Sequence, residues 1–157
     1  VRAVIPNAVC VISGDGSQRE DLLEMAARRG HSEALMLPGN RPQQWVAGLL
    51  ADADVVLATL IGRALVEAAL SSTAVVAYEC EWHSEFITED STGLLVPLRD
   101  TVAMADAVVT LLSDPERANR IGSQARKHAL DVMSPAVVTR VERDLLIPLL
   151  PTGFEHR

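Results

Sequence analysis

The fold of this protein is decided by the stretch DVVLATLIGRALVEAALSSTAVVAYE, residues 54–79. It begins with a continuous apolar run, 54–60, and ends with a second one, 73–79. The residues between them, IGRALVEAAL, are mostly Ala, Leu and Val, as in a buried helix. Strands that are apolar on both faces and are joined by helices are typical of parallel sheets with helices on both sides. The stretch therefore predicts a strand–helix–strand unit of an α/β protein.

The same alternation continues on both sides of this stretch. Pro42 and Pro115 suit the first turn of a helix and Asp100 suits an N-cap, so each marks a helix start. We expect one α/β domain over residues 1–150, a Rossmann-like, doubly wound fold with a parallel sheet of about five strands and C-terminal helices. A polar tail follows at 151–157. Further strands are expected at 8–13, 33–38 and 91–97, and further helices at 18–30, 41–53, 101–114, 115–130 and 135–150.

The first six residues, VRAVIP, do not fit the usual start of such a domain. They resemble the end of a helix, whereas a doubly wound domain usually opens with a strand and a glycine-rich turn. We therefore expect that the domain lacks its first strand and helix.

The composition excludes several classes of protein. The 157 residues are 48% hydrophobic and 22% charged, which is typical of one globular domain. The net charge of −7 lies in residues 1–100, while residues 101–157 balance 7 acidic with 7 basic side chains, so nucleic acid is not an expected partner. No apolar run approaches the ~18 residues of a membrane span, and no signal peptide is recognisable. We expect a cytoplasmic protein without a transmembrane segment.

Cysteine and histidine spacing argues against a metal site. Cys10 and Cys80 lie in or next to apolar, strand-like runs, so we expect two buried, reduced thiols. No CxxC pair occurs and the histidines show no ligand spacing, so we expect neither a structural metal nor a cofactor.

The first candidate binding loop contains Gly14 and Gly16. Ligands of open parallel sheets bind beyond the carboxyl ends of the strands, which directs attention to the strand-to-helix loops. A dinucleotide-binding fingerprint would need a third glycine where Arg19 stands, so we do not expect NAD. A tight turn at the end of the strand is the alternative explanation of the two glycines.

The second candidate is the start of the helix after residue 60. Gly62 would let an anion approach the free N–H groups of the first turn, and phosphate is the natural guest. Arg63 is unfavourable for the helix dipole there, which makes sense if its charge serves an anion. Glu67 could accept two hydrogen bonds from a diol such as a ribose. The alternative is a solvated ion pair between Arg63 and Glu67, which are spaced i and i+4.

The third candidate is the polar loop after the strand at 73–79. It brings Trp82, His83 and Glu85 together, and we expect these side chains to face a sugar. The alternative is that Trp82 covers the edge of the core while the glutamates are solvated.

These motifs together resemble the C-terminal, nucleotide-sugar-binding domain of family 4, GT-B-fold glycosyltransferases (glycosyl transferases group 1). The resemblance runs from about Ala8 to Leu130 and is carried by VISGDGSQREDLLEMAARRG, LPGN, the helix with Glu67-Ala68, Val75-Val76-Ala77, Glu85, TGLLVP (92–97), Asp100 and LLSDPERANRIGSQARKHAL. Glu67 matches the second glutamate of the family's E-x7-E motif, which binds the nucleotide ribose. Thr59 stands at the first position, where the family has another glutamate.

The resemblance implies which residues bind the donor. The backbone of Gly62–Leu65 matches the segment that meets the diphosphate, and Leu37–Gly39 matches the neighbourhood of the base. The implied nucleotide-sugar-binding residues are Gly14, Gly16, Leu37, Gly39, Gly62, Arg63, Ala64, Leu65 and Glu67; Trp82, His83 and Glu85 are the residues expected to face the sugar, and no residue is assigned a catalytic role.

The resemblance also implies a reaction and its partners. The reaction is transfer of a sugar, of the hexosyl type, from a UDP- or GDP-sugar to an acceptor, with retention at the anomeric carbon and without a bound metal. The acceptor site belongs to an N-terminal domain, and the arginine and lysine that contact the diphosphate belong to the first strand and helix. We therefore expect no activity from this chain alone. The full enzyme could associate peripherally with a membrane.

Two other functions are open at this point. One is a non-catalytic, flavodoxin-like regulatory or protein-interaction module, which would have no affinity for nucleotides. The other is a related sugar-nucleotide epimerase, but the paired acid–histidine loop pattern expected there is missing.

Overall fold

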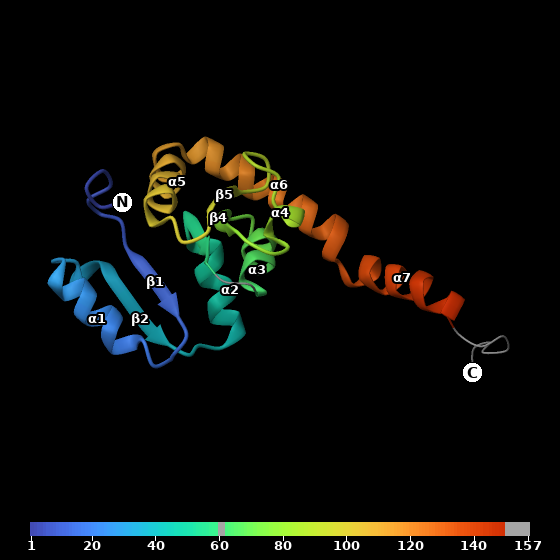
Figure 1. Cartoon of the computed structure of the whole chain (residues 1–157), viewed down its shortest axis with the longest axis horizontal. Coiled ribbons are helices and arrows are strands. Elements are labelled where there is room, and N and C mark those ends of the chain that lie inside the picture. The colour runs from blue at the N-terminus through green and yellow to red at the C-terminus, as the bar shows by residue number, and fades with distance from the viewer. Residues whose placement is uncertain (60–61, 150–157) are drawn as a thin grey trace.

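The computed structural model describes residues 1–59 and 62–149, and its strands are all parallel. Within that part of the chain there are five strands, as expected, but they form two sheets and not one (Figure 1). β1 (Cys10–Ser13) pairs with β2 (Leu35–Gly39), and β4 (Ala74–Glu79) lies between β3 (Val55–Ala58) and β5 (Leu94–Pro97). The α/β, Rossmann-like prediction is confirmed, while the single continuous sheet is replaced by two sheets. Within residues 1–59 and 62–149, β1 and β3 each pair with one strand only.

The helices follow the sequence pattern with small shifts at their ends. Asp100 caps its helix as expected, because its carboxylate accepts hydrogen bonds from the N–H groups of Val102 and Ala103 at 3.1 and 2.9 Å. The short α4 was not expected. The helices are α1 (Arg19–Arg28), α2 (Gln43–Asp52), α3 (Ala64–Leu70), α4 (His83–Phe86), α5 (Thr101–Ser113), α6 (Pro115–Met133) and α7 (Pro135–Leu146), with 3-10 turns at Ser32–Ala34 and Ile147–Leu149.

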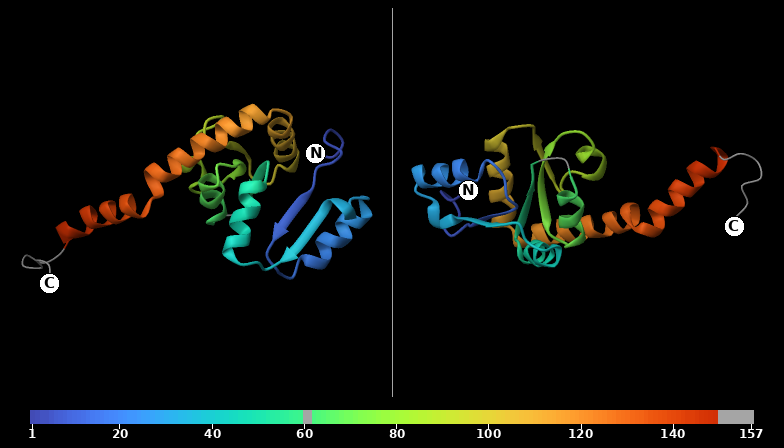
Figure 2. Two further views of the ribbon diagram at one scale, coloured as in Figure 1. Left: turned by 180° about the vertical axis from the view of Figure 1, so that it is seen from behind. Right: turned by 90° about the horizontal axis from the view of Figure 1, so that it is seen from below.

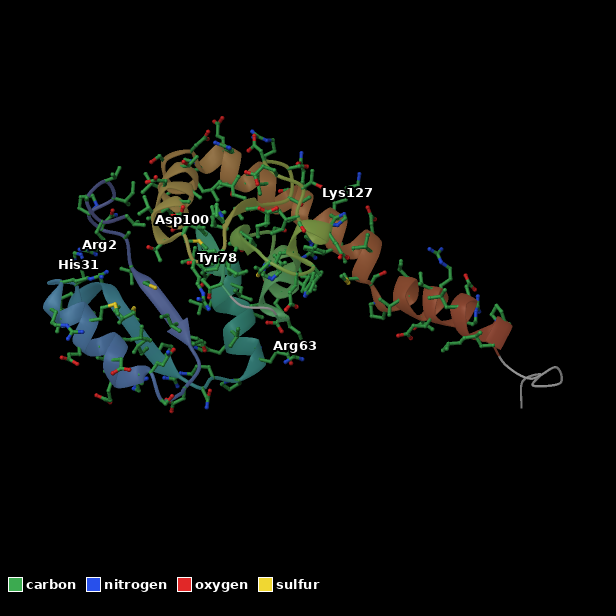
Figure 3. The ribbon with its side chains drawn as sticks, in the orientation of Figure 1. Arg2, His31, Arg63, Tyr78, Asp100 and Lys127 are labelled. Carbon is green, nitrogen blue, oxygen red and sulfur yellow. The ribbon has the colours of Figure 1, made fainter. Side chains whose placement is uncertain are left out.

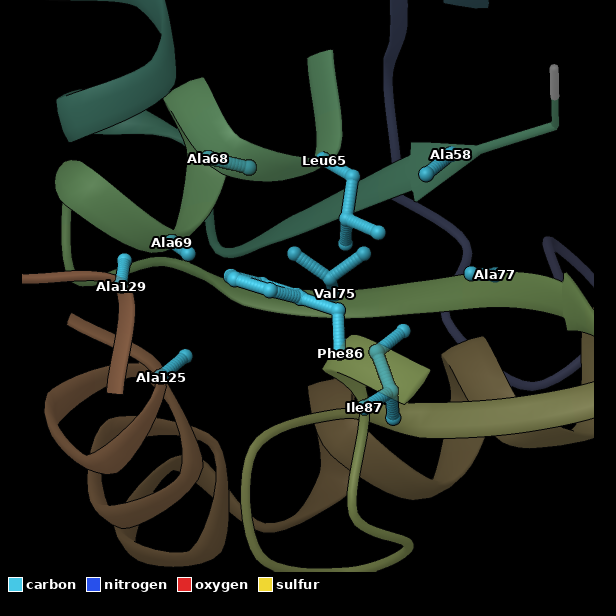
Figure 4. Packing of buried hydrophobic residues seen from close by; sticks show 10 residues of the cluster. All are labelled: Ala58, Leu65, Ala68, Ala69, Val75, Ala77, Phe86, Ile87, Ala125 and Ala129. Carbon is cyan, nitrogen blue, oxygen red and sulfur yellow. The ribbon is translucent and has the colours of Figure 1, made fainter. Parts of the chain in front are cut away.

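Two hydrophobic clusters cover the two faces of the three-stranded sheet. Val75 and Ala77 of β4 point to one face and Ala74 and Val76 to the other, because side chains alternate along a strand. On the first face they pack with α3, α4 and α6 (Figure 4). On the second face they pack with α5 and the first turns of α6. This half of the molecule is therefore doubly wound, as the sequence predicted.

Small residues bring α6 close to the turn between α3 and β4. A Cβ atom on Gly122 would overlap the backbone carbonyl group of Ser72, so only glycine fits there. The guanidinium of Arg126 donates to the carbonyl oxygen of Leu70 at the end of α3. Both contacts join α6 to the helix that carries part of the candidate site.

The two-stranded sheet has far fewer neighbours. No residue of β1 is buried, and α1 buries none of its side chains either. Cys10 is exposed and Cys80 is half-buried, so the expectation of two buried thiols was wrong, although both thiols are free. The physical reason for Cys10 is that β1 has a neighbouring strand on one side only.

At the start of the chain, residues 1–7 form turns, and the N–H of Ile5 donates to the carbonyl oxygen of Val1 to close one helical turn. At the other end, α7 extends away from the body and buries no side chain (Figures 1 and 2). No helix in the described part of the chain is both long and apolar enough to cross a membrane. The expected polar tail, 151–157, lies outside the described residues.

Candidate functional site

The loops after β1 and β2 lie side by side at the carboxyl ends of these strands. The N–H of Gly14 donates to the carbonyl oxygen of Gly39 at 3.0 Å, so the structure brings these two predicted residues together. Both have positive φ angles, 136° and 76°, which favour glycine. Leu37 lies half-buried on β2. The φ angle of Gly14 supports the tight-turn explanation for the first of the two glycines, Gly14 and Gly16, to which it was applied.

Two other predicted glycines are not required by the fold. Gly16 and Gly62 have no positive φ, and a Cβ atom at either position would meet no heavy atom within 4 Å. Both lie at the surface of the chain. An open backbone of this kind lets a ligand approach the N–H groups closely.

Gly62 and Arg63 precede a short helix, α3, which begins at Ala64, two residues after Gly62, so the expected helix start near Gly62 is confirmed. Leu65 is buried in the core together with residues of β3 and β4, and it anchors the first turn of α3 there (Figure 4). The first turn of α3 is therefore fixed to the core through Leu65, while Ala64 is exposed on its other side.

Arg63 and Glu67 make the ion pair that the spacing allows, but the contact is weak. Arg63 Nε lies 4.0 Å from Glu67 Oε1, and the Arg63 side chain is 91% exposed (Figure 3). The Glu67 side chain is only 35% exposed. An exposed pair of this kind contributes little to stability, so its charges remain available to a ligand.

The three predicted residues of the loop after β4 differ in their exposure to solvent. His83 is completely buried, Trp82 is half-buried and Glu85 is exposed. His83 therefore presents no surface to a sugar in this structure, and Trp82 and Glu85 are the accessible members of the set. The indole of Trp82 packs edge-on against the rings of His83 and Phe86, with centroids 5.4 and 5.9 Å away.

Sequence reasoning missed the side chains that hold the next loop, between α4 and β5, in place. Thr92 is buried, and its hydroxyl accepts from the N–H of Thr88 at 2.8 Å. The carboxylate of Glu89 accepts from the N–H of Leu95 at 2.8 Å. The available signal was the polar run between α4 and β5, in which such side chains often bind backbone groups.

A groove lies elsewhere on the molecule. It has a volume of about 640 Å³ and is lined by the amino ends of β3 and β4, by α5, by the start of α6 and by the N-terminal turns, including Ile5, Asp54, Ser72 and Asn119. None of the predicted site residues lines it. Among residues 1–59 and 62–149, no three His, Cys, Asp or Glu side chains come together in a way that could hold a metal ion.

Parallel strands with helices on both faces, and glycine-bearing loops at their carboxyl ends, define a Rossmann-like ligand-binding domain. The sequence model of the family described as "Glycosyl transferases group 1" matches residues 1–128, so the chain belongs to this family.

The curated relatives are glycosyltransferases and are much longer than this chain. The D-inositol 3-phosphate glycosyltransferase of Nocardia farcinica is 35% identical over 122 residues, which cover 74% of this chain and 27% of that protein. The alpha-D-kanosaminyltransferase of Streptomyces kanamyceticus is 29% identical over 119 residues, 73% of this chain and 31% of that protein. The chain thus spans about a third of the length of these relatives.

Solved structures confirm the fold. The Anabaena protein HepE in complex with UDP matches with a TM-score of 0.84 at 22% identity, over 91% of this chain and 42% of HepE. The isolated C-terminal domain of a glycosyl transferase group 1 family protein, LpcC from Francisella tularensis, matches with a TM-score of 0.71 at 20% identity, over 83% of this chain and 74% of that domain. The fold is that of the Rossmann-like C-terminal half of GT-B glycosyltransferases.

Proposed function

We propose that this chain is the donor-binding part of a retaining, family 4 glycosyltransferase that transfers a sugar from a nucleoside-diphosphate sugar to an acceptor. One observation carries the proposal: the family match spans residues 1–128, which include every strand-end loop where the donor is expected. The complex of HepE with UDP supports a nucleotide ligand for this fold.

In this proposal the diphosphate lies against the backbone of residues 62–65, of which 62–64 are exposed. Free N–H groups at a helix start and the guanidinium of Arg63 would stabilise the diphosphate as it leaves, in the way that fixed donors stabilise developing charge. No metal or cofactor is needed for that role. Arg63 is free to turn toward an anion because its present contact with Glu67 is 4.0 Å long and exposed.

Glu67 is the proposed ribose ligand. It is one turn further along α3, and its carboxylate is partly screened from water, which strengthens hydrogen bonds to hydroxyl groups. Leu37 and Gly39 would lie near the base, with Gly14 and Gly16 beside them. Trp82 and Glu85 are the proposed sugar contacts. Since Thr59 replaces a first glutamate, Glu67 would act without an acidic partner at that position.

We also propose that the complete domain contains one more parallel strand, between β1 and β3, together with its helix. Each of these strands pairs with a single neighbour in the described part of the chain, which leaves a row of backbone N–H and C=O groups unpaired. The partial coverage of the isolated C-terminal domain of LpcC, 74%, supports a missing segment. That strand and helix would carry the remaining cations for the diphosphate, and an N-terminal domain would carry the acceptor, so the chain alone would be inactive.

Hydrogen exchange tests the missing strand. The amides of Cys10–Ser13 that do not pair with β2 should exchange rapidly in this chain, and they should become protected in a longer protein that includes the proposed strand. Equal exchange in both proteins would contradict the proposal.

Titration calorimetry with UDP and GDP tests the donor site. We expect weak binding by the unmodified chain and a loss of about tenfold or more in affinity on Glu67→Ala, since hydrogen bonds to a charged group are lost. Glu24→Ala is the matched control, because Glu24 forms a similar i,i+4 ion pair with Arg28 on the exposed α1. Measurable binding with the same affinity in all three proteins would exclude Glu67 from the site. A complete absence of binding in all three would favour the flavodoxin-like interaction module.

A further inference from the structure

His83 is a buried imidazole whose two ring nitrogens have opposite surroundings. Nδ1 lies 2.9 Å from the backbone carbonyl oxygen of Tyr78. A carbonyl oxygen only accepts hydrogen bonds, so Nδ1 carries the proton of this bond. Nε2 is buried and has no hydrogen-bond partner among the described residues. The geometry therefore assigns a hydrogen to Nδ1.

A phenylalanine or leucine at this position would bury no ring nitrogen, but it would remove the donor to the carbonyl oxygen of Tyr78. The other surroundings of the ring are a thiol and an aromatic ring: Cys80 Sγ lies 3.6 Å from Nδ1, and the indole of Trp82 packs edge-on. The one of these contacts that requires an N–H donor is the Nδ1 hydrogen bond to Tyr78.

This hydrogen bond closes the loop between β4 and α4. Tyr78 belongs to β4 and His83 begins α4, so the bond spans the end of β4 and the turn at residues 80–82. The turn includes Glu81 at a φ of +46°, a strained angle for a residue with a side chain. Backbone bonds from the N–H of His83 to Cys80 and from the N–H of Ile87 to His83 complete the loop.

We propose that His83 is a positioning residue for the donor site. Through its Nδ1–H it ties the loop to the end of β4, and it thereby holds Trp82 and Glu85 at the carboxyl edge of the sheet. Only the part of this inference that concerns nucleotide sugars rests on the proposed function. The hydrogen on Nδ1 and the closure of the loop are properties of the chain itself.

Three variants separate positioning from packing. In His83→Asn the side-chain amide places an N–H near the position of Nδ1, in His83→Gln the N–H lies one bond further out, and His83→Phe fills the space without a donor. We expect His83→Asn to bind a UDP-sugar within about twofold of the unmodified chain, and the other two to bind at least about fivefold more weakly, as the loss of one buried hydrogen bond implies. Equal affinity of all four proteins, or a loss in His83→Asn equal to that in His83→Phe, would overturn the proposal.

A second measurement distinguishes failure of this inference from failure of the proposed function. A long-range nitrogen NMR spectrum of the unmodified chain should show a protonated Nδ1, and hydrogen exchange should show protected amides at Phe86 and Ile87. That protection should persist in His83→Asn and fall in His83→Phe. These results would support the positioning role even if no nucleotide binds. An Nδ1 without a proton, or unchanged protection in His83→Phe, would overturn it.

Discussion

The two sheets of this protein contain similarly apolar strands, but these strands have very different surroundings. β4 reads AVVAYE and its first four residues are buried, whereas β1 reads CVIS and has no buried residue. β4 lies between two strands and has hydrophobic clusters on both faces. β1 has one neighbouring strand. Apolar content alone therefore does not decide burial; the number of neighbouring elements does.

The same contrast holds for the two halves of the chain. Before β3, Ala34 is the one buried hydrophobic residue, while both hydrophobic clusters lie in β3–β5 and the helices around them (Figure 4). Because stability comes mainly from buried apolar surface, most of it must reside in the second half. We expect the β1–α1–β2 unit to open first in hydrogen exchange.

The largest expected effect is a core truncation in the second half. Leu65→Ala removes a side chain that is 1% exposed and should lower the free energy of unfolding by about 3 kcal/mol, measured by urea denaturation. The matched change in the first half is Leu23→Ala, at a leucine that is 40% exposed, and it should cost less than about 1 kcal/mol. Equal losses of unfolding free energy in the two variants would contradict the inference that most of the stability resides in the second half.

A glycine pair gives the next largest effect, and the two changes should have opposite signs. Gly122→Ala places a methyl group against the carbonyl of Ser72 and should destabilise the protein by about 2 kcal/mol. Gly48→Ala lies within α2, where a Cβ meets nothing within 4 Å, and it should stabilise by roughly 0.5–1 kcal/mol through helix propensity. Thermal unfolding of both variants measures the difference. Tolerance of Gly122→Ala would mean that α6 does not pack this closely on the turn.

A smaller effect is expected at the start of α5. Asp100→Ala removes the acceptor for two N–H groups and should cost about 1 kcal/mol, whereas Asp100→Asn, which keeps a side-chain oxygen, should cost much less. Comparing the urea midpoints of the two variants tests the cap. A loss of the same size in Asp100→Asn would point to the charge and not to the hydrogen bonds.

The smallest effect belongs to the first half. Glu24→Ala breaks an ion pair with Arg28 in which both side chains are about two-thirds exposed, so it should change stability by no more than ~0.5 kcal/mol. A larger loss would show that α1 is held by charges more strongly than its exposure suggests. This result also sets the background for the Glu67→Ala titration.

Much of the fold could be predicted because its signals are local. Apolar runs mark the strands, Pro42 and Pro115 mark helix starts, and Asp100 caps α5 as expected. The division into two sheets could not be predicted, since strand pairing joins residues far apart in the chain. α4 was missed because its four residues, HSEF, are too short for a helical period.

The elements that carry the candidate residues were predicted in part. The sequence predicted Gly14 after one strand and Gly39 near the end of another, and the structure has Gly14 directly after β1 and Gly39 as the last residue of β2. Arg63 and Glu67 were predicted in the first turns of a helix, and they lie just before and within α3. The sequence did not foresee that His83 would be buried, because one histidine between polar residues gives no sign of which neighbours will enclose it. The roles of these residues in donor binding remain our proposal.

The sequence by itself determined the order of the strands and of the helices other than α4, the cap at Asp100 and the family. All of these depend on residues close together in the chain or on motifs in a fixed order. The tertiary structure decided which apolar strands are buried, that only glycine fits at position 122, and that the ring of His83 ties α4 to β4. These are contacts between distant segments. Their energy depends on distance and enclosure, and folding alone brings such groups together.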